Sequence, residues 1–169
     1  MSHKVLRKHP NSKMCLVCGL KNQGGLHASF YEIENGELVA LFTARDEHQS
    51  YPGRVHGGII TALLDETIGR AIMTANHDDV WGVTVEFTTR FKKPVPIGVE
   101  LRVVGRIVSE EGRSFHGTGE ILLPDGGIAA TGEGRYVKLP IEKIADFDAA
   151  EQEWGVVTRP GDPDSIPLP

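Results

Sequence analysis

The sequence has no long apolar run and no leader-like beginning. Its hydrophobic stretches are far shorter than the roughly 20 residues that a membrane-spanning helix needs. Met1 to Pro10 include basic side chains, but no apolar segment follows them as it would in a secretory signal. We therefore expect a protein without membrane contact, located in the cytoplasm.

An excess of basic residues is missing as well. The 18 Lys and Arg residues against 23 Asp and Glu residues give a net charge of −5. Nucleic-acid-binding proteins usually gather a basic excess on one face, so we expect no nucleic-acid partner. A local basic group can still bind an anionic small ligand, and the second half of the chain has one: Arg90, Lys92, Lys93, Arg102, Arg106 and Arg113.

Cysteine is scarce, because Cys15 and Cys18 are the only two. They form a C-x-x-C pair, but a structural zinc site normally needs four ligands and no second such pair exists. His3 and His9, or a second chain, are the remaining sources of ligands. A redox motif would precede a helix, whereas the glycines after Cys18 indicate a loop. We expect two reduced cysteines that pack a turn, with no metal and no cofactor.

The 169 residues, 40% of them hydrophobic and 24% charged, fit one globular domain. Residues 57 to about 76 carry apolar side chains on more than one helical face, which predicts a buried helix ended by Asn76 to Asp79. Strands are predicted at 26–33 and 38–43, joined at Asn35-Gly36, and in four later runs that we expect to form an antiparallel meander: 81–91, 99–108, 113–123 and 128–139.

One long apolar helix among six strands is best covered by a sheet that curves around it. We therefore predict an α+β fold with a curved, six-stranded antiparallel sheet. Residues 1–25 are expected to be an irregular arm, 26–139 the folded domain, and 140–169 a helix over 141–154 followed by a proline-rich tail. The exposed edges of such a sheet favour pairing of two subunits.

Asp65 is the outstanding candidate for chemistry. It lies in mid-helix among Ala62, Leu63, Leu64 and Ile68, where an ionised carboxylate is costly unless it is paired. A buried acid tends to have a raised pKa, as a general base often does. The alternative is that Asp65 faces solvent beside Glu66 and Arg70, and the sequence leaves the two hypotheses about even.

The beginning of the helix supplies a second candidate. Gly57 and Gly58 follow His56 and leave the first backbone N–H groups open to a negative oxygen, as in an oxyanion hole. The glycines can equally serve tight packing against the preceding loop. We expect His56 to have a supporting role, since no serine or cysteine nucleophile lies in a recognisable context.

The spacing of these candidates predicts an assembly. Asp65 follows Gly57 by eight residues, which is roughly 12 Å along a helix. One acyl carbon cannot touch both groups of one helix, so a shared substrate requires a dimer with two antiparallel helices. Thr84, early in the next strand, would join the site only if it faces Asp65.

Together these residues resemble the hotdog-fold acyl-CoA thioesterases. The likeness is carried by Val55-His56-Gly57-Gly58 with Asp65, then by Thr84-Val85-Glu86-Phe87 and by 90–96, with Cys15-Leu16-Val17-Cys18-Gly19 as a similar lead-in. The resemblance implies a hotdog fold and hydrolysis of an acyl-CoA. Gly57 would polarise the thioester carbonyl, Asp65 would activate water or attack directly, and Thr84 would assist the water.

The resemblance also implies partners and further site residues. Gly58 and His56 match the shell of the motif, and CoA would lie along a subunit interface, with Arg90, Lys93 and Arg113 as candidates for its phosphates. Ser50 stands where some relatives carry an asparagine that places the water, so Thr84 would take a larger share. The expected assembly is a homodimer or a dimer of dimers.

Two other functions remain open. A hotdog protein that binds acyl-CoA without hydrolysing it would not need to keep Asp65 and Gly57, and a hydratase uses a histidine in a different sequence context. The acyl group is not indicated by the sequence.

Overall fold

A computed structural model describes residues 1–75 and 79–169. These described residues form one α-helix, three short 3₁₀ helices and eight strands in a single sheet, whose order is β4-β7-β6-β5-β3-β2-β1-β8. The strands are β1 (Ser2–Lys8), β2 (Ser29–Ile33), β3 (Leu38–Thr43), β4 (Trp81–Phe91), β5 (Glu100–Glu111), β6 (Ser114–Leu122), β7 (Ile128–Leu139) and β8 (Ser165–Pro167). The helices are η1 (Asp46–His48), α1 (Gly57–Arg70), η2 (Ala71–Ala75) and η3 (Ile141–Lys143).

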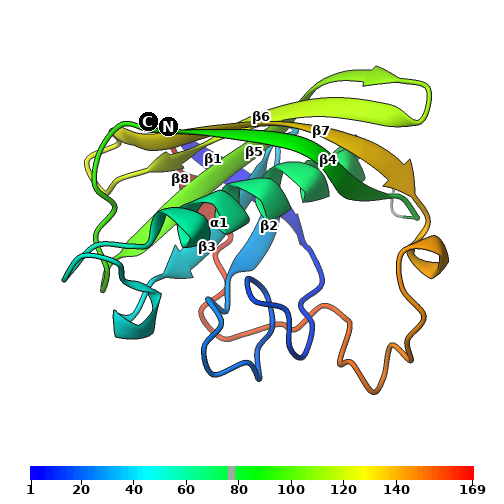
Figure 1. Cartoon of the computed structure of the whole chain (residues 1–169), viewed down its shortest axis with the longest axis horizontal. Helices are drawn as coiled ribbons and strands as arrows, with labels where there is room; N and C mark the ends of the chain where they lie inside the picture. The colour runs from blue at the N-terminus through cyan, green and yellow to red at the C-terminus, as the bar shows by residue number, and fades with distance from the viewer. Residues whose placement is uncertain (76–78) are drawn as a thin grey trace.

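The sheet bends around α1, which lies against β3, β4, β5, β6 and β7 (Figure 1). Glycines allow this close approach. A Cβ at Gly117 on β6 would lie 2.5 Å from Cγ2 of Ile68, and one at Gly105 on β5 would lie 2.9 Å from the carbonyl oxygen of Thr67. The core is the apolar layer between helix and sheet, with Leu63, Leu64 and Ile68 at its centre.

The prediction of six strands is wrong, because both ends of the chain add one. Ser2–Lys8, expected to be part of an irregular arm, pairs with β2, and the tail returns to pair Ser165–Pro167 with β1. The termini therefore meet, and the N–H of Leu168 donates to the carbonyl oxygen of Met1 at 2.8 Å (Figure 1). Polar segments become strands here because neighbouring strands offer them backbone partners.

The predicted meander and the predicted helix ends also need correction. β5, β6 and β7 form a meander, but β4 pairs with β7 and not with β5, because α1 brings the chain across to that edge. The α-helix ends at Arg70 and continues as η2, while the expected end at Asn76 lies outside the described residues. In place of a helix over 141–154 there is one 3₁₀ turn, since this segment is mostly exposed and buries too little apolar surface to stabilise a helix.

Within residues 1–75 and 79–169, no helix combines the length and apolar character that crossing a lipid bilayer requires.

Candidate active site

Three elements of the fold bring polar groups to one carboxylate. Asp65 lies on α1, and Thr84 on β4 is paired in register with Tyr136 on β7. Oγ1 of Thr84 donates to Oδ1 of Asp65 at 2.8 Å. The phenol of Tyr136 lies 3.1 Å from the same Oδ1 and 3.1 Å from the backbone oxygen of Asp65, so its proton is shared between them. Thr84 thus faces Asp65, which was the condition for counting Thr84 among the site residues.

The environment of Asp65 favours its neutral form more than water does. Burial raises the pKa of this half-buried carboxyl, and the neighbouring Glu66 raises it further. The hydrogen bonds from Thr84 and Tyr136 lower the pKa, but burial prevails. Asp65 is half-buried, so its position lies between the two alternatives left by the sequence. Thr84 and Tyr136 hold its carboxyl, whereas Glu66 pairs with Arg70 at 2.9 Å.

Asp65 opens onto a cavity of about 280 Å³. Thr84, Tyr136 and Gly82 form one part of the wall, and the rings of Trp81 and Trp154 meet edge to face at 5.1 Å in another. None of the described residues donates a hydrogen bond to Oδ2 of Asp65. That oxygen is therefore available to a water molecule or a substrate in the cavity.

The N-terminus of α1 faces a different pocket, of about 400 Å³, that Gly57 lines together with Ser50, Phe91 and Lys93. His56 is the N-cap, and its Nδ1 accepts the N–H of Gly58 at 2.9 Å. The N–H of Gly57, by contrast, meets no acceptor in the part of the chain that the structure describes. His56 thus has the geometry of a supporting cap, and Gly57 is the residue with a backbone donor to offer.

The predicted site residues consequently fall into two groups on one chain. Asp65 and Thr84 share the first cavity, whereas Gly57 and Ser50 line the second pocket, roughly 12 Å away along α1. Within one chain, the Asp65 carboxyl and the Gly57 N–H therefore do not meet at one atom.

The candidates for CoA phosphates are also divided. Lys93 lies beside Ala129, to whose carbonyl oxygen its N–H donates at 2.9 Å. Arg113 lies beside Lys138, whose N–H donates to the carbonyl oxygen of Arg113 at 2.7 Å. These two points of β7 are nine residues apart, or about 30 Å in a strand. The exposed Arg90 lies nearer the Lys93 end, 3.8 Å from Glu133.

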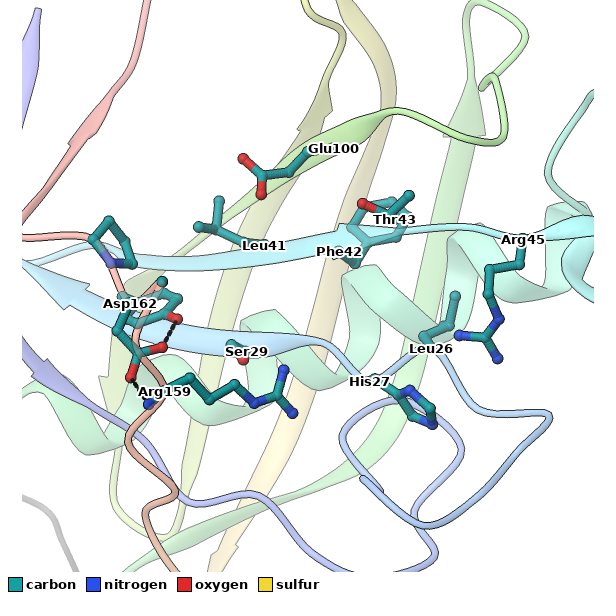
Figure 2. Close-up of a pocket in the computed structure, with 13 residues that line it drawn as sticks. Leu26, His27, Ser29, Leu41, Phe42, Thr43, Arg45, Glu100, Arg159 and Asp162 are labelled. Carbon is teal, nitrogen blue, oxygen red and sulfur yellow. Dashed lines mark hydrogen bonds between the residues drawn. The ribbon is translucent and has the colours of Figure 1, made fainter.

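A larger cavity, of about 450 Å³, contains none of the predicted residues. It lies between β2, β3 and the C-terminal tail, where Asp162 accepts hydrogen bonds from Tyr31 and from the N–H of Arg159 (Figure 2). The tail is anchored there, because Lys8 and Asp162 form an ion pair at 2.6 Å. Its size alone does not connect it with the acid on α1.

Sequence reasoning missed Tyr136. The signal was present in the alternation of β7, in which Ala130, Gly132, Gly134 and Tyr136 point inward. Tyr136 is fully buried and stacks on Phe115 at 4.8 Å, so a buried phenol in need of a partner was predictable, but the identity of that partner was not.

Comparison with known proteins finds a likeness over the segment that carries α1 and β4. Residues 52–130 match the family model described as Thioesterase superfamily. This segment includes α1 and β4, and with them Gly57, Asp65 and Thr84, but neither Tyr136 nor the cysteines.

Among curated proteins, the chain is 32% identical over 89 residues to acyl-coenzyme A thioesterase THEM4 of Rattus norvegicus, covering 53% of this chain and 37% of that protein. The chain spans between 37% and 55% of the lengths of the curated relatives it matches.

Solved structures give the same picture of the fold. The crystal structure of a thioesterase superfamily protein superposes with a TM-score of 0.68 and 28% identity, over 74% of this chain and 63% of the other. A Streptococcus mutans protein bound to acetyl CoA has a TM-score of 0.56 and 19% identity, over 62% and 82%. The second likeness is one of fold alone.

Proposed function

We propose that this chain is a member of the thioesterase superfamily with the hotdog fold, and that it hydrolyses an acyl-CoA thioester to a free acid and CoA. The observation that carries the proposal is the Asp65 carboxylate. Thr84 and Tyr136 hold its Oδ1, while its Oδ2 is left to the cavity. This is the geometry of a general base or a nucleophile that is oriented through one oxygen and reacts through the other.

The chemistry follows from this orientation. In the general-base route, Asp65 takes a proton from a water molecule whose oxygen attacks the thioester carbon. The carbonyl oxygen becomes an oxyanion, the carbon–sulfur bond breaks, and the CoA thiolate leaves and takes up a proton. In the nucleophilic route, the carboxylate attacks the thioester carbon first, the carbon–sulfur bond breaks and the CoA thiolate leaves. Water then hydrolyses the resulting anhydride, which releases the free acid and restores the carboxylate. Both routes require a hydrogen-bond donor for the oxyanion.

We place that donor on a second copy of the chain. The Gly57 N–H has no acceptor among the described residues, and it lies too far from Asp65 of its own helix to serve the same carbonyl. The free sheet edge supports a homodimer, because β4 is an edge strand and carries the exposed apolar residues Val85 and Phe91. Two such dimers could associate into a tetramer in which each dimer keeps the same pairing of Gly57 with Asp65.

The acyl-CoA class of substrate rests on likeness and on charge. The relatives from rat and mouse are named acyl-coenzyme A thioesterases, and the Streptococcus mutans neighbour is a complex with acetyl CoA. In this chain, Lys93 lines the pocket at Gly57, and Arg90 lies near the end of β4. Both offer positive charge to phosphates. Coenzyme A is thus part of the substrate, and the proposed reaction uses no other cofactor.

The test is free-thiol release from short, long and aryl acyl-CoA substrates by the wild type and Asp65→Asn. The isosteric amide cannot take a proton or attack, so we expect turnover to fall about a thousandfold or more while the protein stays folded. Asp146→Asn is the matched control, because Asp146 is exposed and does not line the cavity, and it should retain full activity.

Near-normal turnover by Asp65→Asn would contradict the assignment. If the wild type cleaved no thioester while an acyl-CoA raised its melting temperature, the chain would be a binding protein and not an enzyme.

A further inference from the structure

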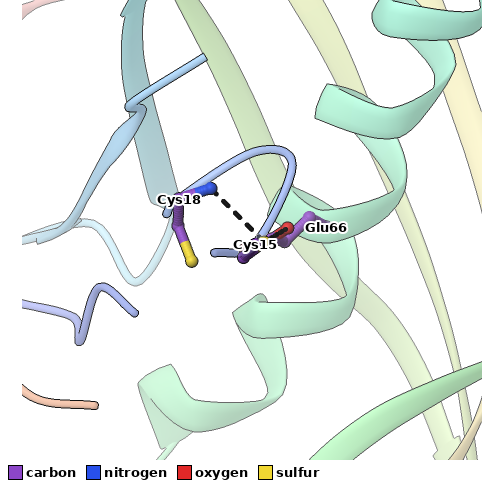
Figure 3. A group of neighbouring side chains, drawn as sticks. All are labelled: Cys15, Cys18 and Glu66. Carbon is purple, nitrogen blue, oxygen red and sulfur yellow. Dashed lines mark hydrogen bonds between the residues drawn. The ribbon is translucent and has the colours of Figure 1, made fainter. Parts of the chain in front are cut away.

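The cysteine pair lies against the helix that carries Asp65. Cys15 and Cys18 belong to the loop between β1 and β2, and their sulfur atoms and a carboxylate oxygen of Glu66 all lie within 4.8 Å of one another (Figure 3). Cys18 is buried, Cys15 and Glu66 are half-buried, and all three line the Asp65 cavity. The proposed hydrolysis uses none of them.

The loop is built so that both sulfurs turn to the same side. The N–H of Cys18 donates to Sγ of Cys15 at 3.4 Å, and the N–H of Gly19 donates to the carbonyl oxygen of Cys15 at 2.8 Å. A Cβ at Gly19 would lie 2.4 Å from the backbone N and O of Cys15, so only glycine fits there. The side-chain amide of Asn11 stabilises the loop by donating to the carbonyl oxygen of Cys18 at 2.8 Å.

We propose that Cys15, Cys18 and Glu66 bind one thiophilic divalent metal ion, with Zn²⁺ as the best match to this donor set. Thiolate sulfur and carboxylate oxygen are both zinc ligands. In a tetrahedral site, sulfur and oxygen ligands lie about 3.5 Å apart, and two sulfurs about 3.8 Å apart. Cys15 Sγ is already 3.3 Å from Oε2 of Glu66, joined by a hydrogen bond whose proton the ion would replace.

The local charge suits a divalent ion. Two thiolates and a carboxylate carry three negative charges, and Arg70 supplies one positive charge, donating from Nη2 to Cys18 Sγ at 3.2 Å and from Nε to Glu66 Oε1 at 3.0 Å. The remaining two negative charges equal the charge of the ion. Binding releases the two thiol protons to solvent and involves no oxidation.

Arg70 would act as an outer donor to the ligands. It is buried, and it is held in place by the carbonyl oxygen of Pro10 at 2.8 Å and by the ring of Phe30 at 4.3 Å. Such hydrogen bonds to ligating sulfur and carboxylate orient metal ligands in proteins. The fourth coordination position is left to water in the cavity, because all three ligands line it.

This inference departs from the expectation of no metal, which rested on the shortage of cysteine and histidine ligands. The fold supplies the missing ligand from a residue 51 positions away on α1. A bound ion would fasten the N-terminal loop to the helical turn that carries Asp65.

The test is a titration of the reduced, metal-free 169-residue chain with Co²⁺, followed by displacement with Zn²⁺. We expect one Co²⁺ per chain, with a thiolate-to-cobalt charge-transfer band and visible bands of tetrahedral intensity. Cys15→Ser and Cys18→Ser should abolish the charge-transfer band or shift it, and Glu66→Gln should weaken binding at least about tenfold. The exposed Glu142→Gln is the matched carboxylate control and should bind like the wild type. Asp65→Asn should also keep the spectrum.

Absence of the charge-transfer band in the reduced wild type would overturn the proposal, as would unchanged affinity in a folded Glu66→Gln. A reduced chain that binds no Co²⁺ but readily forms a Cys15–Cys18 disulfide would identify a redox pair instead. If the serine variants do not fold, Glu66→Gln, which keeps both thiols and the loop, decides the question. Because the spectrum is read without turnover, its failure is distinguishable from failure of the proposed hydrolysis.

Discussion

The middle and the N-terminus of α1 differ in whether their polar groups find hydrogen-bond partners within the same chain. In the middle, Asp65 has two side-chain donors from neighbouring strands and lies on the wall of a cavity. At the N-terminus, His56 caps Gly58, but the N–H of Gly57 meets no acceptor among the described residues. The acid is thus fully prepared within one chain, whereas the helix start offers a donor with nothing in its own chain to receive it. This difference is expected of two half-sites that are completed by a second copy.

Gly57→Pro is the most direct test of the backbone donor at the N-terminus of α1. Proline removes the N–H, yet it suits the first position of a helix. His56, with φ −62° and ψ 137°, already has the backbone conformation required before proline. Loss of an oxyanion donor should lower kcat about 100- to 1000-fold.

Gly57→Ala is the control for that experiment, because it adds a Cβ beside Phe91 but keeps the N–H. We expect it to retain most of the activity, with the two variants melting at similar temperatures. Equal activity of the proline and alanine variants would show that the Gly57 N–H takes no part in the reaction.

Complementation tests whether the two halves belong to different chains. Asp65→Asn and Gly57→Pro chains, co-expressed with different tags, should each be nearly inactive as homodimers. In the mixed dimer both defects fall into one site and leave the other intact, so a statistical mixture should recover about a quarter of wild-type activity. Recovery is measured after purification through both tags, where it should approach half. A mixed dimer as inactive as its parents would place both groups in one chain's own site.

The sequence was informative about the groups on α1 and less so about what surrounds them. Asp65 and Gly57 stand out because an acid among apolar side chains and a glycine pair at a helix start are local signals. Tyr136 and Glu66 acquire their partners over 71 and 51 positions, and such contacts depend on how the sheet folds back over the helix. Periodicity predicts that Tyr136 is buried, but not which atom its phenol meets.

The same contrast applies to the fold. Apolar periodicity predicts α1 and the strands β2 to β7, whereas β1 and β8 contain few apolar residues and become strands through pairing with their neighbours. The tail is held by contacts across the whole chain, such as the ion pair between Lys8 and Asp162. Residues 141–154 are mostly exposed and form no α-helix, and their aromatic side chains pack individually, Phe147 against Trp154 and Trp154 against Trp81.

The hydrogen bonds that orient Asp65 can be removed one at a time while the carboxyl itself is kept. Tyr136→Phe keeps the stack on Phe115 but removes one donor to Asp65, and Thr84→Val removes the other while keeping the side-chain shape. A hydrogen bond to a charged group contributes about 1.5 kcal/mol or more, so each change should lower kcat about tenfold. Thr84→Ser, which restores the hydroxyl, should recover most of the loss. If both phenylalanine and valine variants turned over at the wild-type rate, Asp65 would not need these donors for orientation.

The smallest effect concerns the positive charges at the two ends of the sheet. Lys93 and Arg113 lie about 30 Å apart along β7 of one chain, too far to meet the phosphates of one CoA. In a dimer with antiparallel helices, the Arg113 end of one chain would approach the Lys93 end of its partner. Lys93→Gln and Arg113→Gln should then each raise KM about three- to tenfold with little change in kcat, because a charge-assisted contact to phosphate is lost. The exposed Lys143→Gln should leave KM unchanged. An effect of Lys93→Gln alone would restrict CoA to the helix start, and would remove Arg113 from the site while leaving the two halves of α1 as they are.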